Sequence, residues 1–572
     1  MKRSRRQIAI LLAAGIPLLA SGGALSGLSA QTSSAVQPQP ALPQFEDVTA
    51  KSGIHFQHSF GEKELRTILE GTGSGCAWID YNNDGLLDLY VVNGRHVDGL
   101  TDHSAPDGVE ATNHLYRNNG NGTFTDVTAE AGVPGKGFGV GVTAGDFDND
   151  GYEDLYVTNY NSAILYRNNG HGAFTDVTAK AGVDNPYFGA GAAFLDYDRD
   201  GRLDLFVGNY LKFESNYRQY YSAEHYPGPL SYDPEVNRLF HNNGDGTFTD
   251  VSRQSGIAAE PGRAMGVTAG DFDNDGWPDI YVANDTMKSF LYHNNRNGTF
   301  TNDASDLDVD YGQNGEAATA MGPIFADFDN DGWQDLFVSD ARYHRLYHNP
   351  GKAGGPFQDV TDRSGVGAVS GQYAGWGDGF FDFDNDGWKD LFIVNGGLTW
   401  LVPMEAVLLR NNGNGTFADI SSQAGGFFEE QTVGRGACFA DYDNDGYIDA
   451  FITTLNGEGI LLHNDPPPGK RNHWLTVKLV GTRSTRDGYG ASLEAVTGTQ
   501  RQYLQTTSEG GYLSQNDPRP HFGLGPHTEV DTLIIHWPSG TLQTLHNVKA
   551  DQILTVTEPA STAPAPTAGK TQ

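Results

Sequence analysis

Short runs of alternating apolar and polar residues recur along most of the chain, separated by turns rich in glycine, asparagine and aspartate. One group has F-T-D-V-T at 124–128, a Gly-rich apolar run at 137–144, an acidic turn, and L-Y-V at 155–157. Alternating β-branched and aromatic residues predict strands. The L-Y-R-N-N-G-N-G stretch at 115–122 joins two such runs and predicts a hairpin. Each group therefore predicts four short strands.

The acidic turn has the form D-x-D-x-D-G with a further Asp at position 9, and it occurs seven times. The copies begin at Asp80, Asp146, Asp196, Asp271, Asp327, Asp382 and Asp441. Their spacing of about 60 residues is typical of propellers and other arrays, and four strands per repeat is what a blade requires. We therefore predict an all-β protein with a seven-bladed propeller over residues 44–465, followed by a small C-terminal β-sandwich.

The turn resembles the first half of an EF-hand calcium loop, in which side chains at positions 1, 3 and 5 and a backbone carbonyl at 7 bind one cation. Here the Asp at position 9 would close the shell, and a strand follows instead of a helix. The predicted calcium ligands are Asp80, Asn82, Asp84, Leu86 and Asp88; Asp146, Asp148, Asp150, Tyr152 and Asp154; Asp196, Asp198, Asp200, Arg202 and Asp204; Asp271, Asp273, Asp275, Trp277 and Asp279; Asp327, Asp329, Asp331, Trp333 and Asp335; Asp382, Asp384, Asp386, Trp388 and Asp390; and Asp441, Asp443, Asp445, Tyr447 and Asp449.

A single copy of this turn could be a solvated acidic loop, but seven copies, each followed by a strand, favour up to seven calcium sites. An EF-hand or dockerin needs flanking helices, and the sequence shows none. Asn82 carries no charge, so the first site should be the weakest.

The two ends of the array are complementary. Residues 45–49 read F-x-D-V-T with no L-Y-R-N before them, and residues 461–464 form a hairpin arm with no F-x-D-V-T after it. Pairing them would complete the seventh blade and leave no open sheet edge.

The composition predicts a strongly negative surface charge. The formal net charge is −35, and 27 of the 72 acidic side chains occupy ligand positions of the loops. No basic patch offsets this charge, which argues against nucleic acid as a partner.

Residues 1–30 predict an export signal, because a basic start precedes a short apolar run from Ile8 to Ala20 and small residues follow. The run is too short for a membrane span. Residues 4–8 also fit a twin-arginine signal, so Sec and twin-arginine export both stay open. Residues 31–43 read as a flexible linker. A secreted or periplasmic location would supply the calcium that weak sites need, roughly 10⁻⁴–10⁻³ M.

Two insertions, residues 94–112 and 211–236, interrupt the repeats, and the second contains Phe213, Tyr217, Tyr220, Tyr221, Tyr226 and Tyr232. Loops on a rigid scaffold often carry binding, and clustered tyrosines suit sugar or peptide ligands. The tyrosines could equally pack the loop onto its blade. His96, His103 and His225 have no ligand spacing and are expected at the surface.

The only cysteines are Cys76 and Cys438, four and three residues before their loops in the first and last repeats. A disulfide would lock the seam between these blades. The unequal offset places them on opposite strand faces, so we favour two buried thiols.

Residues 470–558 lack an acidic loop, and runs such as 473–480 and 531–537 predict a small β-sandwich. Residues 559–572 read as a disordered tail.

The repeats resemble the FG-GAP (VCBS-type) repeats of integrin α-chain propellers. N-H-W-L-T-V-K-L-V-G-T, R-D-G-Y-G-A, G-Y-L-S-Q, H-F-G-L-G and W-P-S-G in the C-terminal part resemble the ASPIC/UnbV domain. The pair is similar to the cartilage acidic protein family and its bacterial relatives. The resemblance implies a secreted calcium-binding propeller, with the Asp residues at positions 1, 3, 5 and 9 as ligands, and it implies no reaction.

Two functions fit these features. The first is a non-enzymatic interaction or adhesion module for a protein or glycan, held rigid by calcium. The second is a polysaccharide lyase or hydrolase built on the propeller. The second needs acid–base groups outside the calcium loops. Glu224 with His225, and Asp378 beside Trp376, are the only candidates, and all have a simple interpretation as loop residues.

Overall fold

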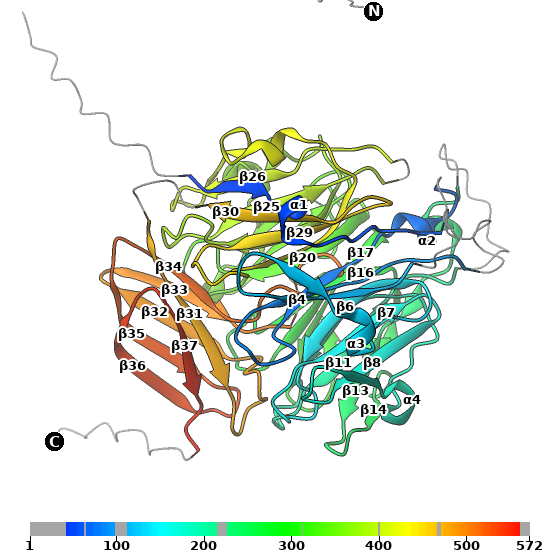
Figure 1. Cartoon of the computed structure of the whole chain (residues 1–572), viewed down its shortest axis with the longest axis horizontal. Coiled ribbons are helices and arrows are strands. Elements are labelled where there is room, and N and C mark those ends of the chain that lie inside the picture. The colour runs from blue at the N-terminus through cyan, green and yellow to red at the C-terminus, as the bar shows by residue number, and fades with distance from the viewer. Residues whose placement is uncertain are drawn as a thin grey trace, which may run out of the picture. The chain divides into compact units, whose positions relative to one another are not determined.

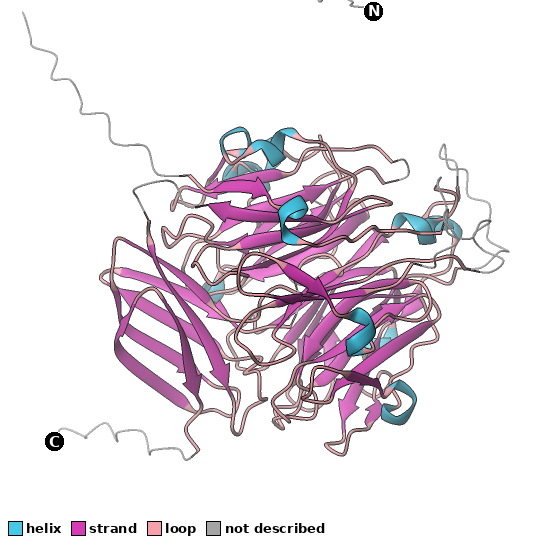
Figure 2. Cartoon of the chain, viewed as in Figure 1, coloured by secondary structure: helices cyan, strands magenta, loops and turns pink. Residues whose placement is uncertain are grey.

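The structure is a computed structural model that describes residues 42–61, 65–97, 111–213, 226–312, 314–398, 401–465, 471–508 and 510–560. The described residues belong to one compact unit. Strands dominate it, with short helices at a few turns (Figure 2). The predicted signal, nearly all of the linker and all but two residues of the tail lie outside the described residues.

Within the described residues, seven four-stranded antiparallel units follow one another. Figure 1 shows their strands coloured from blue to yellow along the chain. The first three are β2 (Cys76–Ile79), β3 (Asp88–Val91), β4 (His114–Asn118) and β5 (Phe124–Asp126); β6 (Gly139–Gly145), β7 (Asp154–Asn159), β8 (Ser162–Asn168) and β9 (Phe174–Asp176); and β10 (Gly189–Leu195), β11 (Asp204–Asn209), β13 (Arg238–Asn242) and β14 (Phe248–Asp250). The next three are β16 (Ala264–Gly270), β17 (Asp279–Met287), β18 (Phe290–Asn294) and β19 (Phe300–Asn302); β20 (Ala318–Ala326), β21 (Asp335–Asp340), β22 (Arg345–His348) and β23 (Gln358–Asp359); and β24 (Gly375–Phe381), β25 (Asp390–Asn395), β26 (Val407–Asn411) and β27 (Phe417–Asp419). A short pairing of β17 with β20 joins the fourth and fifth units.

The last unit combines residues from both ends of the array. It contains β28 (Gly434–Ala440), β29 (Asp449–Thr454) and β30 (Ile460–Asp465), and β1 (Gln44–Asp47) pairs antiparallel with β30. The innermost strands contact one another in the order β2, β6, β10, β16, β20, β24, β28 and back to β2. This closed cycle makes the all-β architecture a propeller, as predicted.

Apolar side chains fill the space between neighbouring sheets, because each inner strand is buried on both faces. In the first unit Ala77 and Ile79 pack towards the second unit, while Cys76 and Trp78 pack towards the last unit. Every blade therefore uses opposite faces for its two neighbours.

The F-T-D-V-T motif is only partly strand. Its first residues form the outer strand. A one-turn helix begins at its Thr in α1 (Thr49–Ser52), α3 (Thr128–Ala131), α4 (Thr178–Ala181) and α5 (Thr361–Ser364), counting the variants F-E-D-V-T and F-Q-D-V-T. Asp126 causes this turn, because its Oδ1 accepts hydrogen bonds from the backbone N and Oγ1 of Thr128 at 3.0 and 2.6 Å. An aspartate two residues before a helix start is a typical local competitor of strand pairing.

The C-terminal part is a two-sheet sandwich. One sheet has the order β34 (His521–Gly525), β31 (His473–Val480) and β37 (Gln552–Thr557), and the other has the order β33 (Gln500–Gln505), β32 (Ser492–Thr497), β35 (Glu529–His536) and β36 (Leu542–Lys549). Apolar side chains from both sheets form one core between them. The boundary between propeller and sandwich stays a prediction, since both belong to the same compact unit.

The segment between β33 and β34 reaches into the centre of the propeller, which the sequence did not predict. Tyr512 and Leu513 are buried in one apolar cluster with side chains from several blades. Gln515 exchanges backbone hydrogen bonds with β2, donating to Cys76 O at 2.9 Å. A Cβ on Gly75 would lie 1.7 Å from the Leu513 carbonyl oxygen, so the backbones approach where only glycine fits. We call residues 510–517 the axial segment.

Both cysteines are buried, and both are thiols in this structure. The expected buried thiols are found, but the argument that opposite strand faces keep the two residues apart is wrong. Since neighbouring blades contact through opposite faces, Cys76 and Cys438 lie in the same apolar cluster at the seam.

Within the described part of the chain, no helix has the length and apolar character needed to cross a membrane.

Candidate metal centres

The seven acidic loops share one backbone conformation. Position 4 has a left-handed φ of 55° to 60° and the glycine at position 6 has a φ of 85° to 94° in every copy. Glycine adopts such angles at no steric cost, and asparagine, which occupies position 4 in six copies, tolerates them better than most residues. The motif therefore folds each loop locally.

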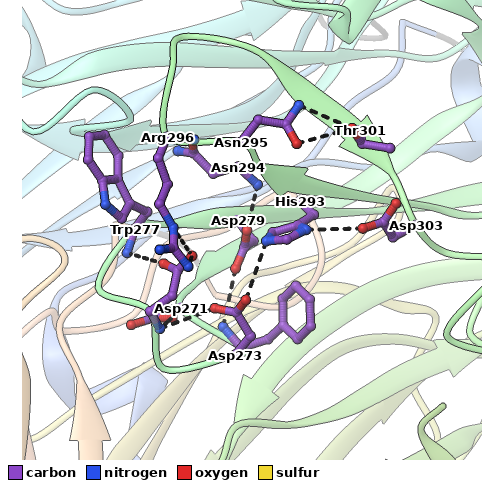
Figure 3. A network of polar contacts seen from close by, with 12 residues as sticks. Asp271, Asp273, Trp277, Asp279, His293, Asn294, Asn295, Arg296, Thr301 and Asp303 are labelled. Atoms are coloured by element: carbon purple, nitrogen blue, oxygen red, sulfur yellow. Dashed lines mark hydrogen bonds and ion pairs between the residues drawn. The ribbon is translucent and has the colours of Figure 1, made fainter. Parts of the chain in front are cut away.

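The loop beginning at Asp271 shows how the backbone orients the carboxylates (Figure 3). Asp271 Oδ1 accepts from the N–H of Asp275 at 2.9 Å, and its Oδ2 accepts from the N–H of Gly276 at 2.8 Å. Asp279, at position 9, accepts from the N–H of Asn294 at 2.8 Å. Such bonds fix ligand orientation in advance, which lowers the entropy cost of binding an ion.

The donor sets converge in several loops. Ligand atoms of Asp146, Asp148 and Asp154 all lie within 4.8 Å of one another. Buried carboxylate oxygens of Asp88, Asp148, Asp198 and Asp329 have no hydrogen-bond partner among the described residues. Unpaired buried carboxylate oxygens in an all-oxygen cluster fit a hard divalent cation such as calcium. Asp88 occupies position 9 of its loop, and the other three aspartates occupy position 3 of theirs.

Burial makes these carboxylates costly to ionise without a cation. It raises the pKa of Asp88, Asp204 and Asp335, all at position 9, to about 8. Neighbouring aspartates of the same loops act in the same direction. A bound cation has the opposite charge and stabilises the ionised form.

We expect calcium affinity to fall as the pH is lowered from about 8 to about 6, because the position-9 carboxyls must lose protons before they bind the ion. Calcium titrations by calorimetry, in buffers of different ionisation enthalpy, measure both affinity and proton release. An affinity independent of pH over this range, without proton release, would contradict the raised pKa values.

In most blades an Arg or His side chain on the third strand lies beside the acidic loop. The sequence did not predict this contact. His293 Nε2 lies 3.3 Å from Asp273 Oδ2. Arg410 Nε donates to Asp384 at 2.7 Å. The equivalent positions hold Arg167, His241, His348 and His463, and each side chain lies beside carboxylates of its own loop. These side chains offset part of the loop's negative charge.

The position-4 side chains link successive loops, and this too was missed. The asparagine Nδ2 donates to the glycine carbonyl of the next loop in the pairs Asn83–Gly151, Asn149–Gly201, Asn274–Gly332, Asn330–Gly387, Asn385–Gly446 and Asn444–Gly85. The last pair joins the seventh loop to the first. Arg199 is the exception, and its Nε donates to Pro538 O in the sandwich at 2.8 Å. The recurring Asn at position 4 was the available signal.

The sandwich contacts the same loops. Asp487 accepts from the N–H of Asp146 at 2.6 Å, and Gln505 accepts from the N–H of Asp271 at 2.9 Å. Asn472 donates to Asp384 O at 2.7 Å. The conformation of the acidic loops is therefore coupled to the docking of the sandwich.

The catalytic candidates that the structure describes are not arranged as an open site. Trp376 and Asp378 are buried, and the Trp376 ring lies 5.0 Å from that of Tyr512 in the axial segment. Glu224, His225, His103 and the tyrosines at 217, 220 and 221 lie outside the described residues. Phe213 and Tyr232 pack against the apolar cluster at the propeller centre. These two aromatic residues of the 211–236 insertion therefore pack the loop onto the propeller, the second of the two roles considered for them.

The fold and the loops define a β-propeller whose repeats each carry an acidic loop suited to a cation. The chain belongs to the FG-GAP-like repeat family. That family model matches residues 80–157, 146–207, 230–282, 271–338, 327–393 and 382–452, and residues 481–563 match the model described as ASPIC and UnbV. The predicted resemblance is confirmed.

Cartilage acidic protein 1 of Homo sapiens is 27% identical over 441 residues, covering 74% of this chain and 63% of the human protein. The Mus musculus protein of the same name is 28% identical over 323 residues, covering 55% of this chain and 47% of its own length. The chain thus spans about half to two thirds of the relatives it matches.

Among solved structures, an Agrocybe aegerita lectin described as recognising non-reducing terminal N-acetylglucosamine matches with a TM-score of 0.37 and 16% identity. The match covers 66% of this chain and 85% of the lectin. BBS1N in complex with ARL6DN matches with a TM-score of 0.40 and 10% identity, over 74% of this chain and 98% of that one. We base no conclusion on likenesses this weak.

Proposed function

We propose that this protein is an exported, calcium-binding β-propeller that acts as a non-enzymatic interaction or adhesion module for a protein or glycan ligand. The observation that carries the proposal is the ring of acidic loops, linked to one another by asparagine side chains and coupled to the sandwich. Calcium at positions 1, 3, 5, 7 and 9 of each loop would fix the ring and leave a rigid scaffold for binding.

The ligand would bind at the end of the propeller away from the calcium loops. Each acidic loop joins the first and second strands of a blade, and successive connections of antiparallel strands alternate between the two ends of a sheet. The segments after the second strands therefore lie at the other end. Leu230 and Val402 belong to such segments, and each is 45% exposed. Contiguous exposed apolar side chains mark interaction sites, and Leu401, next to Val402, is also 39% exposed.

A glycan and protein array probed with the labelled mature chain, with millimolar calcium and with EDTA, tests this proposal. We expect calcium-dependent binding to at least one ligand class, reduced about tenfold or more by Leu230→Asp with Val402→Asp. Leu542→Asp is the matched control, since Leu542 is 60% exposed but lies on β36 of the sandwich. Binding that is insensitive to calcium, or equally weakened by the control, would contradict it.

The alternative of a polysaccharide lyase or hydrolase gains no support from Asp378 and Trp376, because both are buried beneath the axial segment. The same glycan panel can be assayed for product release. Turnover of any glycan would favour the enzyme.

A further inference from the structure

The two cysteines lie on the two inner strands that meet where the ring closes, four and three residues before their acidic loops. Cys76 lies in β2 of the first blade and Cys438 in β28 of the last, and both are fully buried in one cluster. The same pair of positions at the other six seams holds Ala77 with Val142, Thr143 with Ala192, Ala193 with Val267, Thr268 with Pro323, Ile324 with Asp378, and Gly379 with Ala437. Cysteine is paired with cysteine at one seam alone.

The two side chains lie in the same apolar cluster between the blades. The Cys76 thiol lies 3.7 Å from the carbonyl oxygen of Phe451, the residue opposite Cys438 in the β28–β29 pairing. Burial and the neighbouring Cys76 thiol both raise the pKa of the Cys438 thiol. From the other side, Trp78 Nε1 donates to the Cys438 carbonyl at 3.2 Å. Side chains of β2 thus contact backbone carbonyls of both β28 and β29.

We propose that Cys76 and Cys438 form a disulfide that covalently closes the propeller between its first and last blades. The cross-link would enclose nearly all of the ring, and a disulfide that closes a long loop removes the most conformational freedom from the unfolded chain. It would act in parallel with the β1–β30 pairing, which joins only four residues of each strand. The proposed export would place the chain where disulfides persist.

The chemistry needs a disulfide oxidant such as oxidised glutathione or a thiol–disulfide oxidoreductase. One cysteine thiolate attacks the oxidant's disulfide, forming a mixed disulfide and releasing one thiolate. The second cysteine thiolate then attacks the protein sulfur of the mixed disulfide. This forms the Cys76–Cys438 bond and releases the second thiolate of the oxidant. Two protein thiols lose their protons and are oxidised, while one oxidant disulfide is reduced to two thiols.

Timing follows from burial. Both sulfur atoms are shielded once the seam is closed, and the axial segment lies against Cys76, with Ser514 Oγ accepting from its N–H at 3.2 Å. Oxidation therefore occurs while the seam is still open, during folding. The fully folded, reduced protein should react slowly with the same oxidant.

The test is thiol mapping of the full mature chain, refolded with calcium and a mixture of oxidised and reduced glutathione. After denaturation without reductant, alkylation followed by mass spectrometry should find no modified cysteine, a mass lower by two hydrogen atoms, and a cross-linked peptide pair. Reduction should restore two alkylation sites. Two alkylated thiols before reduction would overturn the proposal, and so would glutathione attached to either cysteine as the end product.

Melting curves add a readout of the seam itself. The oxidised wild type should melt several degrees above the reduced protein. Cys438→Ala, which leaves a single thiol, should show no difference between the two conditions. Equal melting of oxidised and reduced wild type would show that the bond does not lock the ring. Because the oxidant is supplied in vitro, a failure of export or of ligand binding would not affect these results.

Discussion

Removal of calcium with EDTA should lower the melting temperature of the mature protein by about 10 °C. Each ion that binds only the folded chain contributes RT ln(1 + [L]/Kd), about 1.4 kcal/mol at a tenfold excess over Kd. Seven such sites contribute roughly 10 kcal/mol, a large fraction of the stability of a typical domain. The metal-free loops would also hold closely spaced carboxylates that burial makes costly to ionise.

The asparagine links make this a cooperative effect. Since Asn83 to Asn444 connect each loop but the third to the next, release of one ion should loosen its neighbours. Asp279→Asn, at position 9 of one loop, should reproduce part of the shift. Asp308→Asn is the matched control, because Asp308 is exposed and lies outside every acidic loop. If EDTA left the melting curve unchanged, the metal would have no structural role, which would contradict the account.

Leu513→Asp should destabilise the protein by about 4 kcal/mol or more, because it places a charge in the apolar centre of the propeller. Leu513 is 3% exposed, and its neighbour Tyr512 donates from its hydroxyl to Thr72 O at 2.8 Å. Leu513 also has a left-handed φ of 58°, a conformation that the surrounding contacts must hold in place. Urea unfolding followed by tryptophan fluorescence measures the effect.

The control for this variant is Leu542→Asp on the exposed face of the sandwich, which we expect to change stability by no more than about 0.5 kcal/mol. If Leu513→Asp were as stable as the wild type, the axial segment would not support the propeller. An intermediate outcome, with the sandwich unfolding first, would show as two separate transitions and would also count against tight coupling.

The sequence predicted those features that depend on local patterns. Alternation and N-G-N-G turns marked the strands, and D-x-D-x-D-G marked the loops, because each pattern acts within a few residues. The complementary motifs at 45–49 and 461–464 indicated closure of the ring, since an unpaired edge strand is costly.

The features that were missed depend on neighbours distant in the sequence. The links from Asn83 and its equivalents run to the next repeat, so one loop alone does not reveal them. The contact of Cys76 with Cys438 requires knowing that adjacent blades present opposite faces. Tyr512 and Leu513 lie between two sandwich strands, and nothing local marks them as a part of the propeller core.

The most direct test of the account is the calcium content of the mature protein after dialysis to equilibrium against buffer with about 1 mM calcium, with the dialysate as the blank. Inductively coupled plasma mass spectrometry should find several calcium ions per chain, approaching seven at saturation, with the loop beginning at Asp80 filling last because Asn82 carries no charge. A folded protein that holds no calcium in excess of the dialysate would contradict the central claim.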